Sequence, residues 1–154
     1  QQGETVNVQL VASDLSFTLG GFAAELSFDP ATLSLTDVVF GNGFDDGFGS
    51  LQFADDMLPG SLLLSDFSFL FSDEMTLAAN QGAEFVLASF TFTALSAGMH
   101  SVSLLDGAQI VSFDNTTLET MSAATASFNV TEVPEPATGL LLLAGLAAFL
   151  RRAK

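Results

Sequence analysis

Three pairs of neighbouring acids are the side chains in this sequence most able to do chemistry. Two of them, Asp45–Asp46 and Asp55–Asp56, fall in the stretch 42–56, NGFDDGFGSLQFADD. Ca²⁺ prefers several oxygen ligands on flexible loops, and Asn42 and the backbone carbonyls add to the carboxylates here. The spacing does not match an EF-hand loop, and ordinary solvated acids show the same pattern. The stretch is therefore a candidate calcium site, with solvated loop acids as the simpler interpretation.

Other groups that enzymes use are scarce. The sequence has no Cys, a single His and no Lys or Arg before residue 151. Catalysis needs a nucleophile with a base, a metal cluster or a perturbed pair of acids, and no Ser lies in a nucleophile-elbow motif. His100 stands alone beside a Gly-containing turn and is expected at the surface. We therefore predict no catalytic residues, and no cofactor other than the candidate calcium.

The charge distribution excludes one class of partner. The chain has 18 acidic residues against three basic ones, and its formal net charge is −15. The three basic residues, Arg151, Arg152 and Lys154, all stand at the C-terminal end. A body of this charge repels phosphate backbones, so it is not expected to bind nucleic acid. Self-repulsion of this kind also keeps a protein soluble.

Phenylalanine supplies all the aromatic side chains. There are 16 Phe and no Trp or Tyr, and most of the Phe fit the apolar face of a predicted strand. Phe44 and Phe48 are the exceptions, since Gly and Asp flank them in the segment 41–49, GNGFDDGFG. They are either residues that pack within a loop or exposed residues for recognition or self-contact.

Alternation of apolar and polar residues with a period of two dominates the chain up to about residue 130, which is typical of half-buried strands. The alternating segments are, in order, ETVNVQLV, GFAAELSFDP, LSLTDVVF, SLLLSDFSFLF, EFVLASFTFTAL, HSVSLLD, AQIVSF and ATASFNV. The alternation slips by one residue between Leu35 and Val38 and between Leu87 and Phe90, as a β-bulge would require.

Short strands separated by turn residues predict an all-β fold, a sandwich or jelly roll of about eight or nine strands. The Gly-rich segment 41–49 is expected to be an exposed loop. Residues 73–83, DEMTLAANQGA, are expected to form one helical turn at most.

The C-terminal segment has a different character. A turn-rich linker, TEVPEPATG, leads into the apolar run 137–150 and the three basic residues. A helix over 137–150 would span about 21 Å at about 1.5 Å per residue. A hydrocarbon core is about 30 Å thick, so the basic residues would have to extend the span by snorkelling. We predict a transmembrane helix with a basic end; a C-terminal helix packed on the sandwich is the alternative.

This C-terminal segment resembles the PEP-CTERM sorting signal of Gram-negative bacteria. The residues that carry the resemblance are Val133, Pro134, Glu135 and Pro136, the apolar run, and Arg151–Arg152. The resemblance implies an exported precursor held in the inner membrane and processed by an exosortase. It also implies delivery to the cell surface or the extracellular matrix.

The body, residues 1–131, resembles cohesin-like domains. The resemblance rests on GETVNVQLVASD, on GGFAAELSFDPATLSLTDVVFG and on LASFTFTALSAGMHSVSLLDGAQIV. It implies a β-sandwich related to carbohydrate-binding modules, in which a platform of Trp or Tyr would be expected for sugar binding. Two domains are thus expected, a cohesin-like sandwich over 1–131 and a sorting signal over 132–154.

Together these features favour a non-enzymatic surface or matrix protein with a structural or adhesive role in an envelope or biofilm. Its expected partners are the exosortase, the inner membrane, exopolysaccharide and further copies of itself. Two alternatives stay open: a filament subunit that keeps its C-terminal helix, and a module that binds a protein or a glycan.

Overall fold

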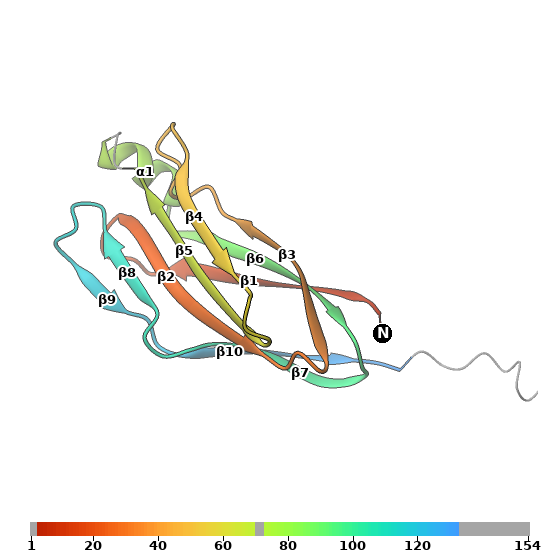
Figure 1. Ribbon diagram of the computed structural model, residues 1–154. Coiled ribbons are helices and arrows are strands. Elements are labelled where there is room, and N and C mark those ends of the chain that lie inside the picture. The colour runs from red at the N-terminus through yellow and green to blue at the C-terminus, as the bar shows by residue number, and fades with distance from the viewer. Residues whose placement is uncertain (1–2, 70–72, 133–154) are drawn as a thin grey trace, which may run out of the picture.

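Two β-sheets packed face to face form the body of the protein (Figure 1). The computed structural model describes residues 3–69 and 73–132. Within these residues there are ten strands and one short helix. An all-β sandwich was predicted from the alternation, and the structure confirms it.

The smaller sheet has the strand order β1-β6-β3 and is antiparallel throughout. Its strands are β1 (Thr5–Ser13), β3 (Leu33–Phe40) and β6 (Glu84–Ala94). The central strand, β6, turns Phe90 and Phe92 towards the other sheet, and both rings are almost completely buried. The alternation seen in the sequence therefore separates the core face of this sheet from its solvent face.

The larger sheet has seven strands, and its main path runs β10-β7-β2-β5-β4. Five of its strands are β2 (Leu19–Phe28), β4 (Ser50–Asp55), β5 (Ser61–Ser68), β7 (Gly98–Leu104) and β10 (Ala124–Val130). The other two are β8 (Gln109–Ser112), which pairs with β2, and β9 (Leu118–Thr120), which pairs with β8. The long strand β2 has room for both neighbours because it pairs with β8 through one half and with β7 through the other.

The two phase slips in the sequence are β-bulges, as predicted. In β3 the register shifts between Leu35 and Asp37, so Thr36 is the extra residue. In β6 the shift lies opposite Leu10 and Val11, so the extra residue is Leu87. Each bulge returns the apolar residues that follow it to the core face.

One helix interrupts the strands. It is α1 (Glu74–Gln81), and it lies at one end of the sandwich (Figure 1). Asp73 caps its first turn by accepting a hydrogen bond from the backbone N–H of Thr76, and Gly82 ends it at a positive φ of 59°. The expectation of one turn at most was wrong, since few apolar residues mark the segment and the two caps define the helix instead.

Two strands were missed in the sequence. Strand β4 lies in the stretch that was assigned to an acidic loop, and β9 has only three residues. The ten strands therefore exceed the predicted eight or nine. The predicted C-terminal helix over 137–150 lies outside the described residues. Among the residues that are described, no helix is long and apolar enough to cross a membrane.

Candidate binding surface

A line of apolar residues crosses the outer face of the larger sheet, on the side away from the core. Each member is the direct cross-strand neighbour of the next, so the side chains lie on the same face. From β9 to β4 the members are Leu118, Val111, Gly21, Phe67 and Leu51. We call these five residues the apolar row.

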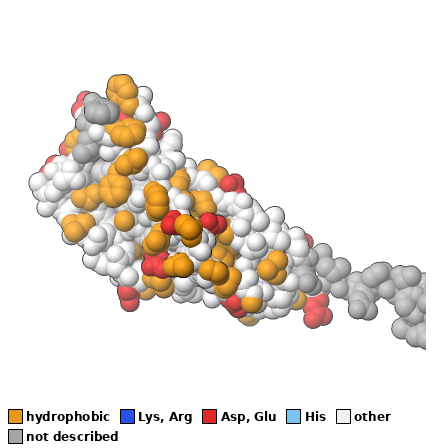
Figure 2. All heavy atoms as spheres, in the orientation of Figure 1, with side chains coloured by type: hydrophobic (Ala, Val, Ile, Leu, Met, Phe, Trp, Pro, Cys, Tyr) orange, Lys and Arg blue, Asp and Glu red, His pale blue; other side chains and the backbone are white. Residues whose placement is uncertain are grey.

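The alternation along β5 establishes which way the row points. Asp66 and Ser68 are buried on the core side, so Phe67 between them points outward. Leu51 is 61% exposed, and Phe53, two residues along β4 on the same face, is 52% exposed. Figure 2 shows hydrophobic side chains gathered on the face of the molecule that carries β4 and β5. The row is therefore accessible to a large partner.

Gly21 makes the centre of the row flat. A Cβ added at this position would overlap the ring of Phe67, so the ring lies directly on the strand backbone. Beside the ring, a cavity of about 50 Å³ is lined by residues that include Val111 and Leu118. The row thus combines a level apolar surface with one small recess.

Carboxylates lie at one end of this face. Leu63 lies on β5, four residues before Phe67 and on the same face. It pairs with Glu25 of β2 on one side and with Asp55 of β4 on the other. Ser61 donates a hydrogen bond to Glu25 at 2.8 Å, and the backbone N–H of Met57 donates to Asp55 at 2.9 Å. No Lys or Arg precedes residue 151, so the described residues hold no such cation to neutralise them.

The two Phe that were singled out in the Gly-rich loop have opposite environments. Phe44 is 1% exposed and packs against Phe22 and Phe85, with ring centroids 5.8 and 5.6 Å apart. Phe48 is 72% exposed. The loop 41–49 is thus not exposed along its whole length, and Phe44 belongs to the core, which corrects its candidacy for recognition.

The four calcium candidates do not come together. Asp45 accepts hydrogen bonds from the backbone N–H groups of Gly47 and Gly49, and Asp46 accepts one from that of Phe48. Strand β4 separates this pair from Asp55 and Asp56, and at about 3.3 Å per residue it holds them more than about 15 Å apart. Across residues 3–69 and 73–132, no three His or acidic side chains are grouped so that they could hold a metal ion.

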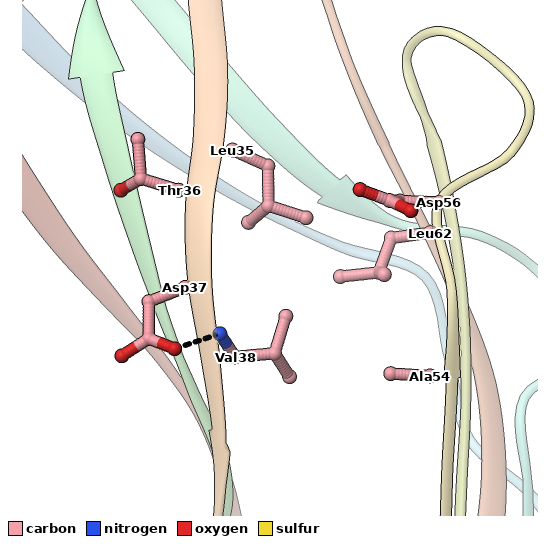
Figure 3. Close-up of a pocket in the computed structure, with 7 residues that line it drawn as sticks. All are labelled: Leu35, Thr36, Asp37, Val38, Ala54, Asp56 and Leu62. Carbon is pink, nitrogen blue, oxygen red and sulfur yellow. Dashed lines mark hydrogen bonds between the residues drawn. The ribbon is translucent and has the colours of Figure 1, made fainter.

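Asp56 instead lines the opening between β3 and β4, where the edges of the two sheets do not meet. This opening, the β3/β4 seam, encloses about 270 Å³. Leu35 and Val38 point into it from β3, while the side chain of Asp37 lies on the other side of that strand (Figure 3). Asp37 accepts a hydrogen bond from the backbone N–H of Val38 at 3.0 Å. The seam therefore has aliphatic walls and a carboxylate at its rim.

His100 lies inside the sandwich, so its expected surface position was wrong. It is 6% exposed because it shares the core face of β7 with Val102 and Leu104. It pairs with Phe128 of β10, and the two rings are 5.8 Å apart. Its Nε2 donates to the carbonyl of Ser96 at 3.0 Å, and its Nδ1 has no hydrogen-bond partner among the described residues.

Asp66 is buried more completely than any other titratable side chain among the described residues. It sits on the core face of β5, and burial raises the pKa of its carboxyl, opposed by weaker hydrogen bonds from Ser50 and Gln52. Gln52 approaches one carboxyl oxygen at 3.4 Å, and the other oxygen has no hydrogen-bond partner in the part of the chain that the structure describes. Sequence reasoning did not single out this residue, because alternation alone assigns Asp66 to a face without saying which face is buried.

The predicted sorting residues Val133, Pro134, Glu135 and Pro136, and the basic residues Arg151, Arg152 and Lys154, lie outside the described residues. The apolar row was not predicted either. Its only signal in the sequence is SLLLSDFSFLF, which is apolar at positions of both faces of a strand.

Comparison with known proteins gives three results. Residues 132–154 match the PEP-CTERM protein-sorting motif. No curated protein matches the chain. Solved structures that resemble it are cohesins at low sequence identity, so their likeness concerns the fold.

A cohesin module from the family 33 glycoside hydrolase of Clostridium perfringens has a TM-score of 0.67 at 11% identity, covering 85% of this chain and 88% of the other. The sixth cohesin of scaffoldin B from Acetivibrio cellulolyticus was solved in complex with a dockerin. It has a TM-score of 0.67 at 15% identity, covering 84% of this chain and 90% of the other. A non-cellulosomal cohesin from the archaeon Archaeoglobus fulgidus has a TM-score of 0.61 at 16% identity, covering 85% of this chain and 83% of the other. The chain therefore has the fold of a cohesin module and ends in a PEP-CTERM protein-sorting motif.

Proposed function

We propose that this protein is an exported binding module whose sandwich captures a protein partner through the apolar row. The PEP-CTERM motif implies an exported protein that an exosortase processes. The single observation that carries the binding role is the run of five consecutive apolar cross-strand neighbours on a solvent face. Apolar surface of this kind, rimmed by polar residues, marks interaction sites in soluble proteins.

The chemistry of the face favours a protein over a sugar or a second copy. The chain has no Trp or Tyr with which to stack a sugar. A second copy would bring its own acids against Glu25 and Asp55. A partner with an apolar anchor over Phe67 and a Lys or Arg near Glu25 would match both the apolar row and the acidic end of the face. The dockerin bound in one of the similar cohesin structures is a precedent for a protein partner of this fold.

The proposed organisation has two parts with separate tasks. Residues 1–131 form the binding domain and residues 132–154 the sorting signal. Residues 137–150 would hold the precursor in the inner membrane, with Arg151, Arg152 and Lys154 on the cytoplasmic side under the positive-inside rule. Processing near Pro134, Glu135 and Pro136 would then deliver the domain to the surface or matrix of a Gram-negative bacterium. No catalytic role is proposed for the protein.

A structural or adhesive role in an exopolysaccharide-rich envelope or biofilm follows if the captured partner belongs to that matrix. The role would then consist of linking the partner to the cell surface. Phe48, exposed at the end of the sandwich that carries the loop 41–49, would add contact area for such a partner.

Site-specific photo-crosslinking tests the binding role. A photoreactive residue at Leu51 should capture one envelope protein, and the same residue at Val39 should not. Val39 is the matched control because it is 55% exposed on β3, in the other sheet. With the captured partner purified, Leu51→Asp should weaken binding at least tenfold and Val39→Asp should not. Equal capture at both positions, or equal affinities, would remove the apolar row from the function.

A further inference from the structure

The two sheets differ in width, and this leaves an open seam along each side of the sandwich. The smaller sheet has three strands, whereas the main path of the larger one has five. The edge strands β4 and β10 are therefore not fully covered on their core-facing side. Ala54 on β4 pairs with buried Leu64, and Ala126 on β10 pairs with buried Val102, yet both alanines are exposed.

The two seams differ in chemistry. The β3/β4 seam has the Asp56 carboxylate among its lining residues, so it can hold water. The seam between β1 and β10, which we call the β1/β10 seam, contains a cavity of about 80 Å³. One of its nine lining residues, Gln9, is polar, and the others are Val8, Leu10, Leu26, Phe90, Val102, Leu104, Ala124 and Ala126.

Among residues 3–69 and 73–132, β6 is the only strand that pairs with β1, so the other edge of β1 is free, and this edge carries none of the usual protection. Natural edge strands are blunted by charges, by Pro or by bulges, because their unpaired N–H and C=O groups recruit other strands. The nine residues of β1, TVNVQLVAS, include no charge and no Pro. The bulge in this pair lies in β6, so β1 itself stays regular. Strand β10, ATASFNV, is also uncharged, in a chain with 18 acids.

We propose that the β1/β10 seam binds one extended segment of another chain, which joins β1 as a fourth strand of the smaller sheet. The backbone of the segment pairs with the free edge of β1, and alternate side chains enter the cavity over Ala124 and Ala126. These inward side chains are aliphatic because the lining is apolar. The segment carries no charge at these positions, because the seam offers none to pair with.

The position of β10 restricts the source of this segment. β10 is the edge strand of the wider sheet and lines the cavity with Ala124 and Ala126, so it forms the wall opposite the added strand. The β1 strand of a second copy has its own larger sheet packed beneath it, and that sheet would collide with β10. A lone terminal or linker segment of a partner has no such layer, so it fits where an edge strand of a folded copy does not.

A labelled peptide tests the proposal on the full chain. The probe is a fluorescein-labelled peptide of alternating Val and Thr, and its control has Pro in place of the central Val. Fluorescence anisotropy should report saturable binding of the first peptide and at least tenfold weaker binding of the second. Ala126→Phe should fill the seam and weaken binding at least tenfold. Ala54→Phe, the equivalent exposed alanine on β4, should leave it unchanged.

Hydrogen exchange supplies a second readout. On peptide binding, the β1 amides that point away from β6 should exchange more slowly, and the amides of β4 should not change. Equal effects of Ala126→Phe and Ala54→Phe, or no slowing along β1, would overturn the proposal. So would a dimer of the full chain that Ala126→Phe dissociates, because the seam would then belong to a second copy.

Discussion

The ring of Phe67 lies on the backbone of Gly21, its direct cross-strand neighbour. No side chain larger than hydrogen fits beneath the ring while the ring keeps this position. The contact joins β5 to β2 at the centre of the apolar row. It also gives the row its flat surface, since the ring lies across the strand and not upright from it.

Gly21→Ala is therefore expected to displace the Phe67 ring and to lower the free energy of unfolding by about 1 kcal/mol. The cost is moderate because Phe67 is partly exposed and can rotate outward. Adding Phe67→Ala should remove the effect, since the clash requires both groups. Chemical denaturation of the four members of this double-mutant cycle, followed by circular dichroism, measures the coupling. Additive effects would contradict the contact.

Gln81 joins the helix to the sandwich through its side-chain amide. Its Oε1 accepts from the backbone N–H of Leu19 at 2.8 Å, and its Nε2 donates to the carbonyls of Leu19 and Gly43 at 2.7 and 3.1 Å. The amide thus pairs with both backbone groups of Leu19 at the start of β2, as a neighbouring strand would. It also holds the loop that buries Phe44.

Gln81→Ala should destabilise the fold by about 2–4 kcal/mol, because it leaves buried backbone groups of Leu19 and Gly43 without partners. The control is Asn80→Ala, which removes one exposed hydrogen bond to the carbonyl of Asp45 and should cost far less. Urea denaturation of both variants provides the comparison. If the two variants lose the same stability, the amide of Gln81 does not hold α1 and the loop in place.

Local sequence patterns predicted the parts of this fold that depend on neighbours along the chain. Alternation identified most strands, and a slip in the alternation placed the bulges at Thr36 and Leu87. Alternation failed to predict a strand where apolar residues and acidic residues occurred in the same stretch. Strand β4 combines exposed Leu51 and Phe53 with acids on its flanks, and the acids suggested a loop.

The features that matter for binding depend on contacts between distant segments. Nothing beside Phe44 in the sequence reveals that Phe22 and Phe85 enclose its ring. The apolar row likewise needs the register of five strands, from Gly21 to Leu118, before its members become neighbours. A single sequence contains no record of that register, so the row could not be predicted.

The sorting signal is expected to be recognised through its Pro-Glu-Pro residues. Replacing Glu135 by Gln, or Pro134 and Pro136 by Ala, should block processing and leave the intact chain in the membrane fraction. The control is Glu119→Gln, which removes an equal charge from an exposed position of β9, outside residues 132–154. Mass spectrometry of membrane and extracellular fractions distinguishes the forms. An intact C-terminal segment on all the extracellular wild-type protein would contradict the expected processing.

The pKa of Asp66 predicts an unusual pH dependence of stability. Because burial raises this pKa in the folded state, the folded protein binds the proton more tightly than the unfolded chain does. The contribution of Asp66 to stability is thus most favourable below the unfolded-state pKa of about 3.9. It declines as the pH rises from there through the folded-state pKa. Asp66→Asn removes the buried charge, so its stability relative to wild type should increase with pH across that window.

Asp114 provides a control of opposite sign. Hydrogen bonds from Ser112 and Thr116 lower the pKa of its carboxyl. Its stabilising contribution is therefore present above the unfolded-state pKa and is lost as the pH falls through the folded-state pKa. Asp114→Asn should lose stability at neutral pH and little at acidic pH, the reverse of Asp66→Asn. Denaturation of both variants between about pH 3 and pH 7 tests this; parallel pH profiles would mean that Asp66 is not held in a desolvated position on the core face.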